Sequence, residues 1–261
     1  MLLDWVFKYT QLFLNFAPKM KIRELNLVRS RAEMKDWPDG KFLIETVNTH
    51  SFVLAQTDAD FARALLDADA LLPDGSYIVK ACRWLKIKKA PQEKIAGMDL
   101  FLFEMEDLER RSGTCLFMGS NDAVLNRIRE KAAEKYPHIR VETYSPPYKP
   151  VFSEEDSQAI ITAITETDPD LLWIGMTAPK QEKWLHEHWE QLPIHCHAGA
   201  IGAVFDFFAG TIARAPDWWI RHDLEWLYRF FREPCRIWRR IFVSGPLFLW
   251  FILKEKLFPS S

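Results

Sequence analysis

Cysteine is scarce in this chain, and its cysteines are scattered. The 261 residues include four of them: Cys82, Cys115, Cys196 and Cys235. No two form a CxxC pair, and a chain of this length without a secretion signal has little need of a disulfide framework. We therefore expect reduced thiols in the core of a cytoplasmic protein. Cys196 stands between His195 and His197, but neighbours on a strand point to opposite faces, so we expect no metal site there.

A strong net charge of either sign is also missing. The chain has 34 Lys and Arg residues and 36 Asp and Glu residues, which gives a net charge of −2. This balance excludes a basic protein that binds nucleic acid by bulk attraction. The charge is unevenly distributed, because residues 210–261 carry nine basic and five acidic residues, +4 in all, and leave −6 for the rest. A basic tail on an acidic body is typical of contact with an anionic surface or ligand.

No apolar run reaches the roughly 20 residues that a membrane-spanning helix needs. Residues 1–21 are interrupted by Asp4, Lys8 and Gln11 and have neither a basic leader nor a cleavage site, so they predict an amphipathic surface helix. Residues 241–253 form an uncharged run of 13 residues between basic flanks. Its aromatic residues favour an interfacial helix at a membrane surface. The alternative is a terminal helix that packs on the body or on another subunit.

Short apolar runs alternate with longer helical patterns, which predicts an α/β fold with a mostly parallel sheet. The expected strands are residues 41–47, 70–73, 115–119, 140–145, 171–175 and 194–199. The expected helices include residues 51–68, 121–136, 153–167 and 180–192. The composition changes near Gly210. We therefore expect a lead-in of residues 1–40, a core of residues 41–209 and an Arg- and Trp-rich appendage of residues 210–261.

Polar residues follow several of the predicted strands, where ligands bind in open α/β sheets. Thr46 and Asn48 leave the first strand, and helix capping is the alternative explanation for them. Asp74 follows the second strand on a Pro-Asp-Gly turn, and turn formation alone would explain that tripeptide.

Another polar loop, GMTAPKQEKWL, begins at Gly175. Glycine permits close backbone approach, and the following helix offers its free N–H groups to an anion. Lys180 would add positive charge, and Gln181 would hydrogen-bond a base, a sugar or a phosphate. For Glu182 we expect the usual role of a first-turn acid, which is to complement the helix dipole, and a catalytic role is the alternative. Gly119 lies in a loop that resembles the first nucleotide loop of a Rossmann unit, but the missing GxGxxG disfavours a nicotinamide or flavin enzyme.

Together these motifs resemble the WecG/TagA/CpsF family, glycosyltransferase family 26. The matching pieces occur in family order: TVNTHS, LLPDGSYIVKA, KIAGMDL, CLFMGS, WIGMTAPKQEKWL, GAIGAVFDFFAGTIARAPDWW and LEWLYRFFREPCRIWRR. They run from about residue 41 to residue 240 and so cover most of the chain. The resemblance implies a Rossmann-like fold of the GT-E type, in which helices flank the sheet and a helical C-terminal appendage follows.

The resemblance also implies an enzyme of polysaccharide biosynthesis that works at the inner face of the cell membrane. Such an enzyme transfers N-acetylmannosamine, its uronic acid or glucose, with inversion, from a UDP-sugar to a polyprenyl-diphosphate-linked saccharide. It needs neither a metal nor another cofactor. Asp74 matches the proposed general base, Thr46 and Asn48 match pocket positions, and Gln181 matches a glutamine that contacts the donor or acceptor. The arginines expected over the site are Arg214, Arg221, Arg229, Arg232 and Arg236.

Two details bear on this interpretation. Lys94 stands where the family usually has arginine, so the charge is kept but the two-pronged donor is lost. Asp58-Ala59-Asp60 has the DxD pattern of metal-dependent transferases, but it falls within an apparent helix and we read it as a solvated face.

Without a metal, basic side chains and helix N-termini must stabilise the diphosphate. The alternative role for the tail arginines is contact with lipid headgroups only. Pro234 is expected to divide the tail helix, and most of Leu224, Leu227, Tyr228 and Phe231 are expected to pack on the body. A homo-oligomer is possible. The alternative function is a non-catalytic protein at the membrane surface that binds nucleotides or anions.

Overall fold

The computed structural model describes residues 19–258 and contains a six-stranded sheet in the order β2-β1-β6-β5-β3-β4. All strand pairs are parallel, which confirms the predicted α/β class. The strands are β1 (Phe42–Val47), β2 (Ala70–Pro73), β3 (Thr114–Gly119), β4 (Arg140–Tyr144), β5 (Leu171–Gly175) and β6 (His197–Ala200). Residues 1–18 of the expected N-terminal helix lie outside the described residues, and the following stretch forms two 3₁₀ turns, Ile22–Glu24 and Arg31–Asp36.

Five strands lie within one residue of their predicted bounds, and the sixth is shorter. Ile194 and Cys196 are buried, but only His197–Ala200 pairs with β1 and β5. The burial of Ile194 and Cys196 therefore reflects their packing in the cluster that contains Leu43 and Leu116, and not membership of a strand.

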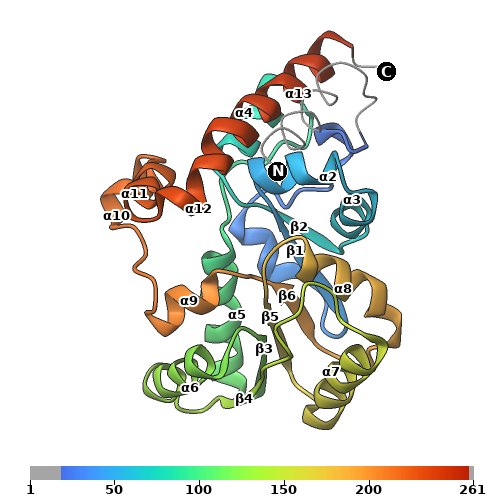
Figure 1. Ribbon diagram of the computed structural model, residues 1–261, viewed down its shortest axis with the longest axis vertical. Helices are drawn as coiled ribbons and strands as arrows, with labels where there is room; N and C mark the ends of the chain where they lie inside the picture. The colour runs from blue at the N-terminus through green and yellow to red at the C-terminus, as the bar shows by residue number, and fades with distance from the viewer. Residues whose placement is uncertain (1–18, 259–261) are drawn as a thin grey trace.

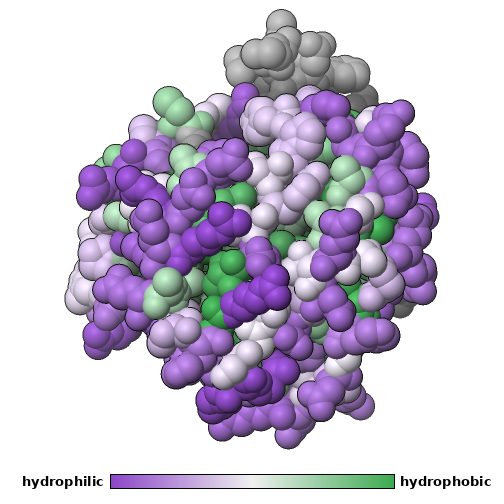
Figure 2. Space-filling view, turned by 90° about the horizontal axis from the view of Figure 1, so that it is seen from below, coloured by the Kyte–Doolittle hydropathy of each residue, from purple (hydrophilic) through white to green (hydrophobic). Residues whose placement is uncertain are grey.

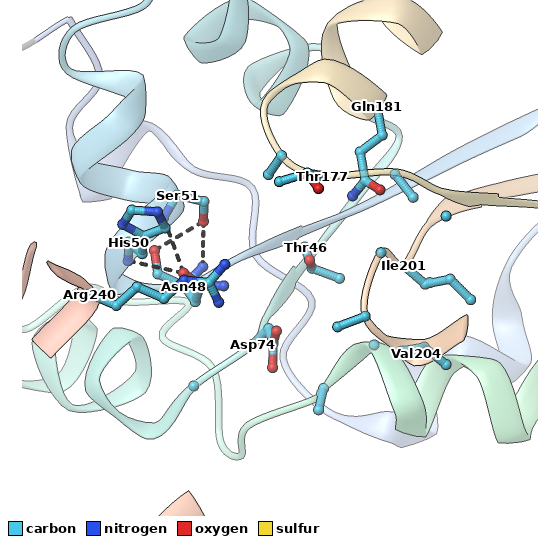
Figure 3. Close-up of a pocket in the computed structure, with 18 of the residues that line it drawn as sticks. Thr46, Asn48, His50, Ser51, Asp74, Thr177, Gln181, Ile201, Val204 and Arg240 are labelled. Atoms are coloured by element: carbon cyan, nitrogen blue, oxygen red, sulfur yellow. Dashed lines mark hydrogen bonds between the residues drawn. The ribbon is translucent and has the colours of Figure 1, made fainter. Parts of the chain in front are cut away.

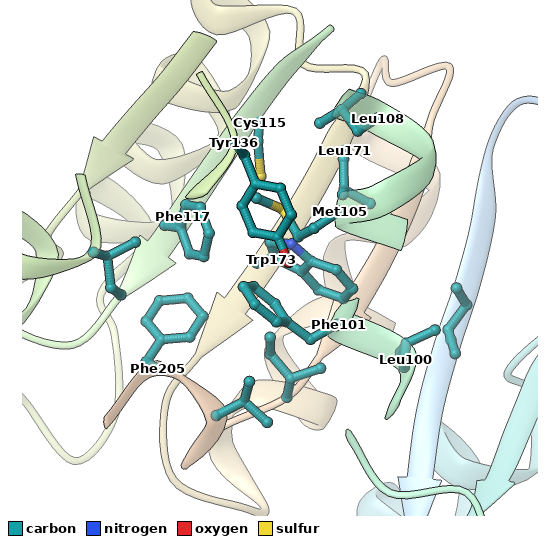
Figure 4. Close-up of a cluster of buried hydrophobic side chains, with 14 of the residues drawn as sticks. Leu100, Phe101, Met105, Leu108, Cys115, Phe117, Tyr136, Leu171, Trp173 and Phe205 are labelled. Atoms are coloured by element: carbon teal, nitrogen blue, oxygen red, sulfur yellow. The ribbon is translucent and has the colours of Figure 1, made fainter. Parts of the chain in front are cut away.

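Helices cover both faces of the sheet (Figure 1). On one face lie α5 (Gly97–Arg111), α6 (Asp122–Lys135) and α9 (Val204–Ala209), and on the other α7 (Glu154–Thr167) and α8 (Lys180–His188), which a 3₁₀ turn, Trp189–Gln191, follows. Each face of the sheet carries its own hydrophobic cluster, because side chains alternate along the strands. Ile44 belongs to the cluster under α5, α6 and α9, and its neighbour Leu43 belongs to the cluster under α7 and α8. The larger cluster is built around Trp173, whose ring lies 5.7 Å from that of Phe101 (Figure 4).

The predicted helix at residues 51–68 is in fact two helices, α2 (Thr49–Ala55) and α3 (Ala59–Leu66). The carboxylate of Asp58 accepts a hydrogen bond from the backbone N–H of Phe61 at 3.1 Å and starts the second helix. Asp58 is therefore a helix cap, and its ion pair with Lys183 at 3.0 Å is a second structural role. The next helix, α4 (Ser76–Trp84), follows β2.

The C-terminal segment leaves the body and then returns to it (Figure 1). Its helices are α10 (Asp217–Arg221), α11 (Glu225–Arg232), α12 (Pro234–Arg239), a π-helical turn (Arg240–Ser244) and α13 (Gly245–Leu257). The break at Pro234 confirms the expected division. Helix α11 has no buried residue. Leu224, Leu227 and Tyr228 are half-buried, whereas Phe231 is exposed, so the expected packing on the body is wrong for Phe231. Cys235 on α12 is likewise exposed, whereas the other three cysteines are buried free thiols.

Helix α13 packs one face against α2 and the lead-in segment. Its buried residues Phe248 and Phe251 lie against Phe52, with the Phe52 and Phe248 rings edge to face at 5.4 Å. The carboxylate of Glu255 accepts hydrogen bonds from the backbone N–H groups of Ile22 and Arg23 at 3.0 and 3.1 Å. No described helix is both long enough and apolar enough to cross a membrane.

Two glycines, one in a tightly packed position and one in open space, provide a matched test of how closely the chain is packed at each. A Cβ atom added at Gly175 would lie 2.4 Å from the Phe205 ring, whereas one added at Gly245, which has helical backbone angles, would meet nothing within 4 Å. We expect Gly175→Ala to lower the free energy of unfolding by about 3 kcal/mol, as overpacking does. Gly245→Ala should raise it by about 0.5–1 kcal/mol, because alanine costs less entropy in a helix. Urea denaturation of both variants checks this, and equal effects would contradict it.

Candidate active site

A cavity of about 1440 Å³ lies at the carboxyl ends of the strands, between the sheet and the C-terminal segment. Its wall contains residues that follow β1, β2, β3, β5 and β6 and the first turns of α2, α4, α5 and α8. Figure 3 shows Thr46 and Asp74 facing the open space between Asn48 and Gln181. Helix N-termini carry partial positive charge, so several of them turned toward one cavity favour an anionic ligand.

The structure brings most of the predicted site residues to this cavity. Those that line it are Thr46, Asn48, Asp74, Lys94, Gly175, Lys180, Gln181, Arg214 and Arg229. Gly119, Arg221 and Arg232 are not part of the wall. A Cβ atom at Gly119 would lie 2.5 Å from the Gly175 carbonyl oxygen, so this glycine allows β3 to approach β5. Arg221 and Arg232 are exposed.

Asn48 holds the loop after β1 and also faces Asp74. Its side-chain oxygen accepts hydrogen bonds from the backbone N–H groups of His50 and Ser51 at 3.0 and 3.1 Å. The backbone N–H of Asn48 in turn donates to the Ser51 hydroxyl at 2.8 Å. Capping is therefore one role of Asn48, and its polar side chain also lowers the pKa of Asp74. The ends of β1 and β2 are joined at the cavity by the hydrogen bond from the backbone N–H of Asp74 to the Val47 carbonyl oxygen.

Asp74 is a half-buried acid whose backbone N–H donates to the Val47 carbonyl oxygen at 2.9 Å. Burial is the largest effect that raises its pKa, and the negative charges of Glu225 and Asp99 raise it further, to about 6. The positive charge of Arg229 and the polar side chain of Asn48 oppose this shift. Glu225 and Arg229 both belong to α11, so the C-terminal segment tunes an acid that lies 151 residues before Glu225 in the chain.

Gln181 is buried, and both ends of its amide group are hydrogen-bonded. Its oxygen accepts from the backbone N–H of Met176 at 3.1 Å, and its nitrogen donates to the Glu182 carboxylate at 3.0 Å. Gly202 lies beside this amide, because an added Cβ would be 3.5 Å from the Gln181 oxygen. These contacts fix the amide orientation and leave one N–H of the nitrogen for a ligand.

Two buried acids near the cavity floor were missed or misassigned by the sequence interpretation. Glu182 is buried and lines the cavity, which its position in the first turn of α8 did not by itself predict. Glu45 on β1 is buried too, and neither of its carboxylate oxygens has a hydrogen-bond partner among the described residues. Burial, followed by the charge of Glu182, raises the pKa of Glu45 well above its usual value. A glutamate within the apolar strand FLIETV was the available signal.

The cations at the cavity differ in how they are engaged. Lys94 donates to the Ile220 carbonyl oxygen at 3.0 Å and pairs with Asp223 at 3.3 Å, so it attaches the C-terminal segment to the body. Arg229 lies with its guanidinium 5.6 Å from the centre of the Phe207 ring. Two of its buried nitrogens, Nε and one Nη, have no hydrogen-bond partner among the described residues. Buried donors of this kind are normally satisfied, so Arg229 is prepared for an anionic ligand.

His50 joins the start of α2 to the π-helical turn. Its Nδ1 lies 2.8 Å from the Ser244 hydroxyl oxygen. Burial, followed by the positive charge of Arg240, lowers the pKa of His50 to about 4, so the ring is neutral near pH 7. Figure 3 shows Arg240 beside His50 and Asn48. Among residues 19–258, no three His, Cys, Asp or Glu side chains gather as metal ligands would.

Comparison with known proteins gives consistent matches over most of the chain. Residues 18–261 match the sequence model of the family described as "Glycosyl transferase WecG/TagA/CpsF family". A protein of Bacillus subtilis (strain 168) is 30% identical over 214 residues, which cover 82% of this chain and 80% of the relative. A protein of Bacillus spizizenii is 30% identical over 221 residues, which cover 85% and 82%. Both are named N-acetylglucosaminyldiphosphoundecaprenol N-acetyl-beta-D-mannosaminyltransferase.

The buried Glu182 makes stability depend on pH in a defined direction. Burial is the main cause that raises its pKa from 4.5 to about 7. Between these values the folded protein keeps a proton that the unfolded chain releases, so stability falls as pH rises through this window. Glu182→Gln should remove up to about 3 kcal/mol of that fall. Urea denaturation at several pH values measures it, with Glu187→Gln on the exposed side of α8 as control. Parallel curves for the wild type and Glu182→Gln would refute the assignment.

Proposed function

Because the chain belongs to the WecG/TagA/CpsF family of glycosyl transferases, we propose that it transfers a sugar from a UDP-sugar to a polyprenyl-diphosphate-linked saccharide. The names of the two Bacillus relatives support this acceptor class and make N-acetylmannosamine the first donor to test. The observation that carries the proposal is the position of one half-buried acid, Asp74, beside the unpaired donors of Arg229 in the same cavity.

In this proposal Asp74 is the general base. Its carboxylate takes the proton of the acceptor hydroxyl while that oxygen attacks the anomeric carbon of the donor sugar. The bond between the anomeric carbon and the UDP oxygen breaks on the opposite side, so the configuration is inverted. A pKa of about 6 suits this step, because the group is largely ionised near pH 7 and is still a stronger base than an ordinary carboxylate.

The departing UDP gains negative charge on its diphosphate, and we propose that protein groups balance this charge without a metal. Arg229 offers two unpaired buried donors, and arginine matches phosphate oxygens in geometry. Arg214 and Lys180 line the same cavity, and the helix N-termini around it add partial positive charge. The free N–H of Gln181 would orient a sugar or phosphate oxygen.

We further propose that the protein works at the inner face of the membrane, attached through its C-terminal segment. Nine of the fourteen exposed large apolar side chains among the described residues lie between Trp218 and Phe258. The face seen in Figure 2 is different, because mainly hydrophilic side chains surround scattered hydrophobic patches there. Apolar side chains next to basic residues are typical of interfacial helices on anionic lipid.

The proposal is tested with purified protein, a panel of UDP-sugars and a synthetic N-acetylglucosaminyl diphospholipid. We expect UDP release together with one new glycosidic bond. Asp74→Asn keeps the shape of the side chain but cannot accept the proton, so turnover should fall by about 10²–10⁴-fold while UDP binding by calorimetry is retained. UDP binding without sugar consumption in the wild type would favour a non-catalytic binding protein. A near-normal rate in Asp74→Asn would exclude this residue as the base.

The pH dependence of kcat/KM tests the assignment of the base independently. Asp74 must be ionised to act, so activity should rise with pH around 6. Glu225→Gln removes a charge that raises this pKa, so the acid limb should move to lower pH. Arg229→Gln removes a charge that lowers it, so the limb should move to higher pH in addition to the loss of rate. Asp217→Asn, on α10 and outside the cavity wall, is the control. A limb that both cavity variants leave in place would mean that another group titrates.

A further inference from the structure

The cavity continues into an apolar arm that the proposed chemistry does not use. We propose that this arm binds the polyprenyl chain of the acceptor, an inference that rests on the proposed function. The arm is the part of the wall formed by Ile237, Ile241, Gly245, Pro246, Phe248 and Leu249. None of these residues is charged, and all belong to α12, the π-helical turn or the start of α13.

Gly245 keeps the arm open. Its backbone angles are those of an ordinary helix, so the chain conformation there does not require glycine. A Cβ atom added at this position would meet no other atom within 4 Å. Pro246 follows and has no N–H group. The Gly-Pro pair therefore presents an apolar surface with free space above it.

The arm is held rigidly on the side away from that space. Phe248 and Phe251 of α13 are buried against Phe52, and the His50–Ser244 hydrogen bond joins α2 to the turn that precedes α13. The π-helical turn between α12 and α13 widens the helix at this point, and such turns often occur at functional sites.

An exposed apolar ridge leads from the arm along α13. Leu249 lines the cavity and is 63% exposed, and Leu253 and Leu257 follow at 39% and 62%. Residues four apart lie on the same face of a helix, so these three leucines form one continuous stripe. Exposing such a stripe to water is unfavourable. The arm and the ridge together form a track from the polar cavity to the protein surface.

The chemistry of the two ends of this track identifies its occupant. Arg214 and Arg229 line the same cavity as the arm, and Arg229 has two unpaired buried donors. Arg240 is the one charged residue of the π-helical turn in the arm, and the exposed ridge that continues along α13 consists of leucines. A molecule that fits both parts has a diphosphate attached to a long hydrocarbon chain, as in a polyprenyl diphosphate. A second copy of this chain would cover the leucines, but the apolar arm and the unpaired donors of Arg229 lie in one cavity, which favours a single ligand with both an apolar and an anionic part.

The test measures binding rather than turnover, with undecaprenyl diphosphate and a short-chain prenyl diphosphate as probes in detergent. The wild type should bind the undecaprenyl compound more tightly. Gly245→Phe fills the arm and should weaken binding of the long-chain compound by about tenfold, the equivalent of about two buried methylene groups. The short-chain compound should bind as before. Leu66→Phe on α3 adds the same ring outside the cavity and is the matched control.

Leu249→Gln provides a second variant that does not depend on the packing at Gly245, because its side chain is largely exposed. It should also weaken binding of the long-chain compound selectively. Equal losses for both probes, or no loss in either variant, would overturn the inference. A change in oligomeric state by light scattering without a change in binding would assign the ridge to self-association instead. Because no sugar is transferred in this assay, selective binding of the long chain stands even if the donor panel gives no product.

Discussion

The contact between Lys94 and the turn before α11 helps to hold the C-terminal segment beside the cavity, where this segment supplies part of the wall. The Lys94 ammonium group bonds to the Ile220 carbonyl oxygen and pairs with Asp223, which also pairs with Lys80. Such half-exposed ion pairs contribute only about 1 kcal/mol each, so the packing of α13 on α2 must supply much of the remaining attachment. Between these two attachments, α11 carries Glu225 and Arg229 to Asp74. Without them, the acid after β2 would have an open cleft beside it and no charged neighbours from the C-terminal segment.

The cavity changes character along its length. Glu182 lines it and acts on Glu45 of β1 through its charge, and both acids have raised pKa values because burial disfavours their charged forms. The middle combines Asp74 with Arg229, where opposing charges partly offset the effect of burial. The end toward α13 is uncharged apart from Arg240. Acidic, cationic and apolar parts of one wall suit the ligand that we propose, whose parts are a sugar, a diphosphate and a hydrocarbon chain.

Local patterns predicted most of the sheet and much of the site, for identifiable reasons. Strand ends in parallel sheets meet at one edge, so Thr46, Asp74 and Gly175 were predicted to lie together. The same reasoning failed for Gly119, because a residue at a strand end can serve a neighbouring strand instead of the cavity. The burial of Glu182 was not predicted, because a position in the first turn does not by itself reveal which way that turn of the helix faces. Asp58 was predicted to lie within a helix instead of at its start, because an aspartate occurs both as a helix cap and on an exposed helix face.

The sequence by itself determined the fold class, five of the six strands, the division at Pro234 and the polar loops, because each depends on residues close together in the chain. Only the tertiary structure decided which tail arginines line the cavity, which carboxylates lose contact with water, and that α13 packs one face on α2 while it leaves a leucine ridge exposed. These outcomes depend on distance and burial between segments far apart in the chain. Because charge and desolvation act through space, no local pattern contains them.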